Sequence, residues 1–297
     1  MLTPDPAALP AEVQALYPFA VQSWDSPQGL MRYVDHGPQD GQVVLLLHGN
    51  PSWSFLWRNL IIALAARGLR VIAPDHLGMG LSARPAQLLR LADRIAAIQG
   101  LVEHLGVNHF HLGVHDWGGA IGFGVATRWP DRIGRILVTN TGAFLSDRIP
   151  TRIALCRVPV LGRLIAQHFN GFAWPATWMA VENPLPRAVK AGFLAPYGTI
   201  AQRQAVADFV ADIPLEPAHP TRPTLAAIEA ALPRLQAKPM LLFWGLKDFC
   251  FDAAFLAGFT QRFPQAQKQV YPDAGHYVLE DTGAAGVEVA ADFLATV

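Results

Sequence analysis

The chain has 297 residues, of which 52% are hydrophobic and only 15% are charged. This composition supplies enough apolar surface for a large folded core and excludes an intrinsically disordered chain. Lysine and arginine together number 23, as do aspartate and glutamate, so the formal net charge is zero. Because there is also no basic block, nucleic acid is not an expected partner.

Patterns typical of strands and helices alternate along most of the chain. A hairpin is predicted first, with strands at 19–24 and 30–37 around the turn "DSPQG". Apolar strands follow at 42–49, 69–75, 109–116, 132–140, 238–245 and 266–273. Helices are predicted at 53–68, 90–106, 117–130, 251–264 and from 278 to the end. Apolar strands that alternate with helices predict an α/β fold with a mostly parallel sheet covered on both faces.

One interval interrupts this alternation. The residues from Phe144 to about Ala218 are rich in proline, arginine and aromatic side chains and resemble several short helices. They follow the strand at 132–140, so we expect a helical cap over the carboxyl edge of the sheet, where open α/β sheets place their sites. The expected organisation is a core at 1–143 and 219–297, with the cap at 144–218 inserted between its two parts.

The stretch "HFHLGVHDWGGAIGF" is typical of a strand that turns sharply into a helix and exposes one side chain above the sheet. That side chain belongs to Asp116, and no G-x-S-x-G motif elsewhere supplies a competing serine. Further along, Asp248 follows one apolar strand and His276 lies in a loop after the last strand. The chain order of nucleophile, acid and histidine is that of this hydrolase architecture. We therefore predict a catalytic triad of Asp116, Asp248 and His276.

A carboxylate nucleophile indicates the kind of bond that is broken. Attack on an acyl carbon gives an anhydride, whereas attack on a saturated carbon gives an ordinary alkyl ester. The predicted reaction is therefore displacement of a leaving group by Asp116. Water deprotonated by His276 then hydrolyses the ester, while Asp248 orients the imidazole.

Two further residues are predicted to hold the anions that form. The backbone N–H groups of Asn50 and Trp117 are candidates for an oxyanion hole. Their side chains, an amide and an indole, are hydrogen-bond donors suited to a leaving anion in an apolar pocket. Five cap aromatics suggest that this pocket continues as an apolar tunnel, although ordinary core packing is the default for such residues: Phe169, Phe172, Trp174, Trp178 and Phe193.

The segments "HGNPSWSFLWRNL", "APDHLGMGLSARP", "VHDWGGA", "WGLKD" and "AGHYVLED" resemble the haloalkane dehalogenase family of α/β-hydrolases over nearly the whole chain. The resemblance implies that Asp116 is the nucleophile, His276 the base and Asp248 the acid, with Asn50 and Trp117 as the halide-stabilising pair. One branch of the family takes its acid as a glutamate after the preceding strand. Here that place reads "VTNTGAF" and holds no acid, so the role falls to Asp248.

The resemblance leaves more than one activity open. A haloalkane dehalogenase, which yields alcohol and halide, is the first expectation. The alternative is a β-lactone decarboxylase of long-chain olefin biosynthesis, which yields a cis-alkene and CO₂. The segments "LCRVPVLGRLIAQHFN", "FLAPYG", "KDFCF" and "DAGHYVLED" resemble that group and the dehalogenase branch within which it falls, so they do not separate the two activities. An epoxide hydrolase is less well supported, because the cap has one tyrosine, Tyr197, where two are needed. A non-catalytic binding protein is expected to have a damaged triad, and here all three members are present.

The remaining expectations concern surroundings. No cofactor and no metal are expected: His109 and His111 share a strand face, but no third ligand has suitable spacing. The partner is expected to be a small apolar substrate, and the sequence does not indicate an oligomeric state. The apolar runs are too short to span a bilayer, and no signal peptide is recognisable. Cys156 and Cys250 lack a CxxC spacing. A reduced cytoplasmic protein is therefore expected.

Overall fold

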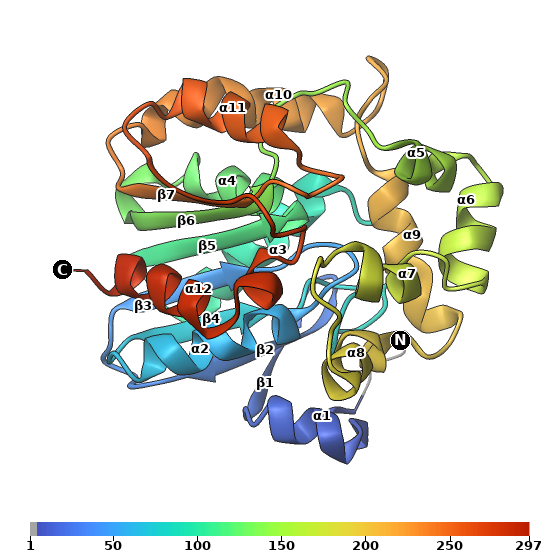
Figure 1. Ribbon diagram of the computed structural model, residues 1–297, viewed down its shortest axis with the longest axis horizontal. Coiled ribbons are helices and arrows are strands. Elements are labelled where there is room, and N and C mark those ends of the chain that lie inside the picture. The colour runs from blue at the N-terminus through green and yellow to red at the C-terminus, as the bar shows by residue number, and fades with distance from the viewer. Residues whose placement is uncertain (1–4, 297) are drawn as a thin grey trace.

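The computed structural model describes residues 5–296, and its centre is one eight-stranded sheet (Figure 1). The strands are β1 (Val21–Ser26), β2 (Gly29–His36), β3 (Val43–Leu47), β4 (Arg70–Pro74), β5 (Phe110–Asp116), β6 (Ile133–Thr141), β7 (Met240–Gly245) and β8 (Gln267–Tyr271). Their order across the sheet is β1-β2-β4-β3-β5-β6-β7-β8. The hairpin β1–β2 and the pair β2–β4 are antiparallel, and the other pairs are parallel. The predicted α/β class with a mostly parallel sheet is confirmed.

The register of the central strands brings distant segments to one edge. β5 lies between β3 and β6, with Leu47 paired to Val114 and Asp116 paired to Thr141. The loop that follows β3 therefore lies beside the end of β5. Every residue of β3 and of β7 is buried, as expected for parallel strands covered on both faces.

Helices cover both faces of the sheet (Figure 1). α2 packs against α12 on one face, and α3 packs with α4 and α10 on the other. The helices of this core are α1 (Ala11–Leu16), α2 (Arg58–Ala65), α3 (Leu91–His104), α4 (Trp117–Ala126), α10 (Arg222–Ala231), α11 (Ala253–Arg262) and α12 (Val278–Ala295). No helix among residues 5–296 is long and apolar enough to cross a membrane.

A second group of short helices lies between β6 and α10, at one end of the molecule (Figure 1). They are α5 (Thr151–Arg157), α6 (Leu161–Arg163), the π-helical turn η4 (Leu164–His168), α7 (Ala173–Met179), α8 (Arg187–Leu194) and α9 (Gln204–Ala211). These segments fall within the interval where the sequence predicted a cap.

Helix boundaries differ from the prediction where side chains or tight turns intervene. The helix expected at 53–68 begins as a 3-10 turn at Ser54–Trp57 and becomes α-helical only at Arg58. The start of α11 at Ala253 is set by Asp252, whose carboxylate accepts the Ala254 N–H at 2.9 Å. The long C-terminal helix is broken at Gly283, where φ is +58°.

Candidate functional site

The turn from β5 into α4 holds Asp116 in an unusual backbone conformation. Its φ is +51° and its ψ is −126°, a region that non-glycine residues rarely occupy and that typically costs about 1–3 kcal/mol. The elbow also needs close approach by its neighbours. A Cβ added to Gly49 would overlap the carboxylate of Asp116, and one added to Gly119 would overlap the hydroxyl of Thr141. The strain and the glycines together fix one carboxylate at the end of the central strand.

The carboxylate of Asp116 is held by backbone donors and faces a histidine. Oδ1 accepts the Asn50 N–H at 2.6 Å. Oδ2 lies 3.9 Å from Nε2 of His276. Burial raises the pKa of Asp116 to about 6, although His276 and the backbone N–H groups of Asn50 and Trp117 act in the opposite direction. Asp116 is therefore mostly ionised at neutral pH, and one of the two expected backbone N–H groups, that of Asn50, already bonds to it.

His276 is oriented by a buried carboxylate. Its Nδ1 lies 2.8 Å from Oδ2 of Asp248, whose side chain is fully buried. Burial alone lowers the pKa of His276, but the charge of Asp248, the hydrogen bond to it and the charge of Asp116 raise the pKa above its ordinary value. The Nδ1–H···carboxylate bond leaves Nε2 facing Asp116, as a base that activates water beside this residue requires. The three residues expected as a triad are thus brought together.

Two residues that the sequence did not single out support this pair. The amide of Asn140, at the end of β6, donates to Asp248 Oδ2 at 2.9 Å, and its Oδ1 accepts the Gly245 N–H. The ring of His115 packs against that of His276, with centroids 4.4 Å apart and the planes tilted by 49°. Its Nε2 lies 2.9 Å from the carbonyl oxygen of His276. Burial lowers the pKa of His115 well below its ordinary value, so the neutral ring donates this bond.

The sequence indicates the roles of Asn140 and His115 only in part. Asn140 lies at the end of β6, where one branch of the family has a glutamate. Its buried amide bonds to Asp248 and does not replace it. His115 does point away from Asp116, as strand alternation predicts. The loop of His276 that receives it comes from a remote part of the chain, so no local pattern indicates the contact.

The side chains of Asn50 and Trp117 both line the cavity beside Asp116. One amide N–H of Asn50 donates to the carbonyl of Val206, on α9, at 3.1 Å. The other amide N–H of Asn50 makes no hydrogen bond within residues 5–296. The Trp117 ring packs edge-on against Phe209, also on α9, with centroids 5.4 Å apart. The indole N–H has no hydrogen-bond partner among residues 5–296, and it therefore remains a free donor.

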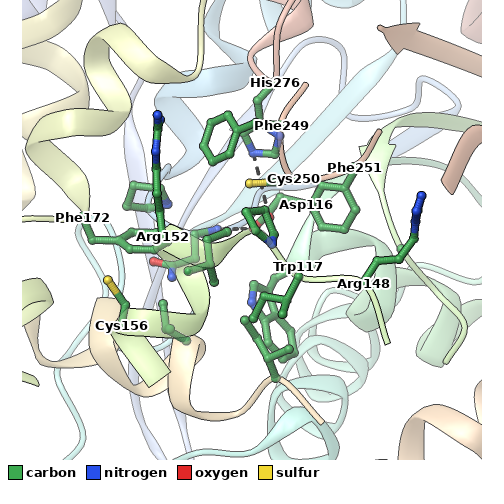
Figure 2. A pocket seen from close by; sticks show the side chains of 18 of the residues that line it. Asp116, Trp117, Arg148, Arg152, Cys156, Phe172, Phe249, Cys250, Phe251 and His276 are labelled. Carbon is green, nitrogen blue, oxygen red and sulfur yellow. Dashed lines mark hydrogen bonds and ion pairs between the residues drawn. The ribbon is translucent and has the colours of Figure 1, made fainter. Parts of the chain in front are cut away.

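The cavity has a volume of about 390 Å³ and lies between the sheet edge and the cap. Its walls are largely apolar, which suits an apolar ligand held by a few polar groups. Figure 2 shows Asp116, His276 and Trp117 around it, with Phe172, Phe249 and Phe251 nearby. The aromatic residues that line it are Trp117, Phe144, Phe172, Phe249, Phe251 and Phe255.

The expected aromatic tunnel is largely wrong. Of its five members only Phe172 lines the cavity. Phe169, Trp174 and Trp178 are exposed by 78%, 57% and 44%. Phe193 is buried against the rings of Phe55 and Tyr277 instead. Phe169, Trp174 and Trp178 thus face outward and Phe193 packs in the core, and aromatic residues around the loop after Asp248 line the cavity in their place.

Other candidate groups lie outside the cavity or form no site. The hydroxyl of Tyr197 donates to the Ser52 carbonyl at 3.1 Å, and this residue does not line the cavity. Within residues 5–296, no group of three or more His, Cys, Asp or Glu side chains is arranged to hold a metal. Cys156 and Cys250 are both free thiols.

Comparison with known proteins agrees with this geometry. The family model of the α/β hydrolase fold matches residues 42–282. A protein from Xanthomonas campestris named cis-3-alkyl-4-alkyloxetan-2-one decarboxylase is 42% identical, with 89% of this chain and 92% of the relative covered. A protein of the same name from Shewanella oneidensis is 39% identical, with 91% and 86% covered.

Haloalkane dehalogenases are also similar in sequence and structure. Haloalkane dehalogenase 2 of Mycobacterium tuberculosis is 35% identical, with 94% of this chain and 93% of the relative covered. The crystal structure of haloalkane dehalogenase DbeA from Bradyrhizobium elkani superimposes with a TM-score of 0.84 at 26% identity, covering 93% of this chain and 98% of that one. Both activities expected from the sequence are thus represented among the relatives. The chain belongs to the α/β-hydrolase family, in the branch that contains haloalkane dehalogenases and cis-3-alkyl-4-alkyloxetan-2-one decarboxylases.

Proposed function

We propose that this protein opens cis-3,4-dialkyl β-lactones and releases CO₂ and a cis-alkene. An oxetan-2-one is a β-lactone, and the relatives named for its decarboxylation are 42% and 39% identical, against 35% for the dehalogenase of M. tuberculosis. That difference is the observation that carries the proposal. It favours the lactone over the haloalkane, which was the first expectation from the sequence.

In the first step Asp116 acts as the nucleophile. Its carboxylate oxygen attacks C4 of the lactone, the saturated ring carbon bound to oxygen, and the C4–O bond breaks. The electron pair of that bond leaves as a carboxylate on C3, so an alkyl ester of Asp116 and a free carboxylate form together. The side-chain donors of Asn50 and Trp117 stabilise this new anion. With a pKa of about 6, Asp116 is ionised for the attack at neutral pH.

In the second step the bond from C3 to the carboxylate breaks. Its electron pair forms the C3–C4 double bond, CO₂ departs, and the C4–O bond to Asp116 breaks to return the carboxylate. Inversion at C4 followed by elimination from opposite faces converts a cis-lactone into a cis-alkene. No water is consumed and no proton is transferred, so this route needs Asp116 but does not need a base.

Haloalkane hydrolysis is the second candidate function, and the free donors of Asn50 and Trp117 favour it. Asp116 displaces the halide from a saturated carbon, and those donors hold the halide. Here the ester of Asp116 must be hydrolysed. His276 removes a proton from water, the hydroxide attacks the ester carbonyl of Asp116, and the alcohol leaves while the backbone N–H groups of Asn50 and Trp117 hold the oxyanion.

Two other activities have weaker support. An epoxide hydrolase needs a hydroxyl near the nucleophile to protonate the epoxide oxygen. The hydroxyl of Tyr197 is bonded to Ser52 and lies outside the cavity lining. A binding protein without activity has no need for the strained Asp116 backbone or for the buried His276–Asp248 pair.

The deciding experiment compares substrates on the same preparation. A cis-dialkyl β-lactone is assayed for alkene and CO₂, and bromo- and iodoalkanes of several lengths are assayed for halide. We expect a higher kcat/KM for the lactone. A higher kcat/KM for a haloalkane reverses the order of the two functions. If Asp116→Asn keeps both activities, Asp116 is not the nucleophile in either reaction.

A variant at His276 separates the two chemistries. In His276→Phe, we expect a rapid first release of one halide per protein, after which the steady-state rate of haloalkane turnover is lower than that of the wild type by about 10²–10⁴-fold. The alkyl ester accumulates on Asp116. Decarboxylation of the lactone is expected to fall by less than about tenfold, because its route uses no water. His109→Phe, at an exposed histidine, is the matched control. Equal loss of both activities contradicts the water-free route.

A further inference from the structure

One face of α9 holds both side chains that are proposed as anion donors. The carbonyl oxygen of Val206 accepts an amide N–H of Asn50 at 3.1 Å. Three residues further along, the ring of Phe209 meets the ring of Trp117 with the two planes at 70°. Residues three apart on a helix share a face, so a single surface of α9 contacts both donors. Val206 and Phe209 are completely buried and do not line the cavity, so their effect on an anion passes through the donors.

The ring of Phe209 also carries a charge on its face. The guanidinium of Arg94, on α3, lies over this ring with Cζ 3.4 Å from the ring centre. The other arginines that lie over aromatic rings within residues 5–296 are 4.1–5.5 Å away. A cation is attracted by the negative face of an aromatic ring, and the attraction strengthens when both are removed from water. Arg94 therefore holds Phe209, which in turn contacts Trp117.

Little else supports the guanidinium of Arg94. The residue is only 3% exposed. Its Nη1 donates to the carbonyl oxygen of Leu77 at 3.3 Å, and its Nε–H has no partner among residues 5–296. A buried charge with so few hydrogen bonds costs stability unless other groups compensate for the lost water. The ring of Phe209 is such a group, so the positions of the two side chains depend on each other.

Three carboxylates attract Arg94, although within residues 5–296 none lies within 4.0 Å of its nitrogens. They belong to Asp93, Asp208 and Asp212. Asp208 and Asp212 pair with other arginines, at 2.7 Å and 2.9 Å. The three acids raise the pKa of Arg94, but burial outweighs them and lowers it to about 10, so Arg94 is charged at neutral pH. Because these acids offset the charge at longer range, the main effect of Arg94 is on the ring that it touches.

We propose that Arg94 and Phe209 are positioning residues of the active site, which hold the indole N–H of Trp117 in the direction of a leaving anion. The Trp117 ring borders a cavity of about 390 Å³, which leaves room for it to turn. A donor that is held in place needs no reorganisation when negative charge develops, so fixing the ring strengthens anion binding. The proposal rests on the proposed role of Trp117 as a donor, and it applies equally to a halide and to the carboxylate of an opened lactone.

NMR of the indole N–H groups tests this positioning without any substrate. The chain has eight tryptophans, and Trp117→Phe identifies the signal of Trp117 among them. The intact protein is titrated with sodium bromide or sodium acetate at constant ionic strength, and the shift of the Trp117 signal gives a Kd for each anion. In Phe209→Leu and in Arg94→Met, we expect the Kd of both anions to rise by about three- to tenfold.

Matched controls carry the same substitutions away from the cavity. Phe263→Leu changes a buried ring that packs against Phe123 and Phe259. Arg132→Met changes an arginine that lies over the ring of Trp129. Both controls should bind bromide and acetate with the wild-type Kd. A merely structural contribution to the fold is common to all four positions, so a change confined to the variants at positions 94 and 209 reports on the anion site.

The signals of the remaining tryptophans report whether each variant is folded. If Arg94→Met or Phe209→Leu does not fold, Arg94→Lys, which keeps the charge but loses the flat guanidinium, and Phe209→Met take their places. Wild-type Kd values in folded variants at both positions contradict the proposal. A wild type whose Trp117 signal responds to neither anion overturns the donor role and this inference with it. A wild type that binds the anions but releases neither CO₂ nor alkene from a lactone refutes the proposed function alone.

Discussion

The burial of Asp116 predicts that the nucleophile destabilises the fold. Its pKa is raised from 3.8 to about 6 by burial, and this value already includes the opposing attraction of His276. The native state therefore binds a proton more tightly than the unfolded chain does. The stabilisation by that proton is fully present below pH 3.8 and is lost as the pH rises through 6.

The magnitude follows from the two pKa values. A difference of about two units corresponds to about 3 kcal/mol of unfolding free energy, of which about 1.4 kcal/mol is lost between pH 5 and pH 8. Asp116→Asn keeps the shape of the side chain but has no such ionisation. We therefore expect the stability of Asp116→Asn relative to the wild type to rise by about 1.4 kcal/mol from pH 5 to pH 8.

Urea unfolding at pH 5, 6, 7 and 8 measures this difference, and comparing pH values removes any constant effect of the substitution. Asp131→Asn, at an exposed carboxylate, is the control and should follow the wild type at every pH. A relative stability of Asp116→Asn that stays constant or falls as the pH rises refutes the reasoning, because the buried carboxylate then carries no desolvation cost.

Three further predictions concern turnover. Because Asp116 must be ionised to attack, kcat/KM is expected to fall about tenfold for each pH unit below 6, and a pH-rate profile that is flat between 5 and 7 contradicts this role. Asp248→Asn removes the charge that orients His276, so haloalkane turnover should fall by about 10²–10⁴-fold with the ester of Asp116 visible by mass spectrometry; an unchanged rate assigns the acid elsewhere. Gly49→Ala places a Cβ on the carboxylate of Asp116 and should lower turnover by more than about 100-fold with the circular dichroism spectrum unchanged. The control Gly198→Ala, whose Cβ meets only the side chain of Gln202 at 3.6 Å, should be active. Wild-type turnover in Gly49→Ala contradicts the close packing of Gly49 against Asp116.

The sequence predicted the sheet well because its strands are continuous apolar runs. The whole of β3 and β7 is buried, and such segments have no alternative but a sheet covered on both faces. The sharp turn at Asp116 was equally predictable from sequence, because it needs small residues beside Asp116 and the glycines that follow it in the chain meet that need. Helix starts were less predictable, because caps such as Asp252 and the 3-10 turn before α2 depend on single contacts.

The wall of the cavity was not predictable in the same way. Phe169 and Trp174 have the composition of a tunnel lining, yet both are exposed because α7 and η4 present them to the outside. Asn140 and His115 support the His276–Asp248 pair from strands whose sequence indicates only burial. Which face of a short helix points inward is decided by packing against α9 and the core, and a single sequence does not contain that information.

The identity of the leaving group is hidden for a related reason. A halide and the carboxylate of an opened lactone are both anions, and the same donors of Asn50 and Trp117 suit either one. In both proposed reactions the expected nucleophile, Asp116, attacks a saturated carbon. The two chemistries differ only in the fate of the ester, which is broken by water beside His276 in one and by loss of CO₂ in the other. The proposed lactone route therefore requires that water stay away from the ester of Asp116 until CO₂ has left, and the apolar side chains that line the cavity with His276, including Phe249 and Phe251, suit that exclusion.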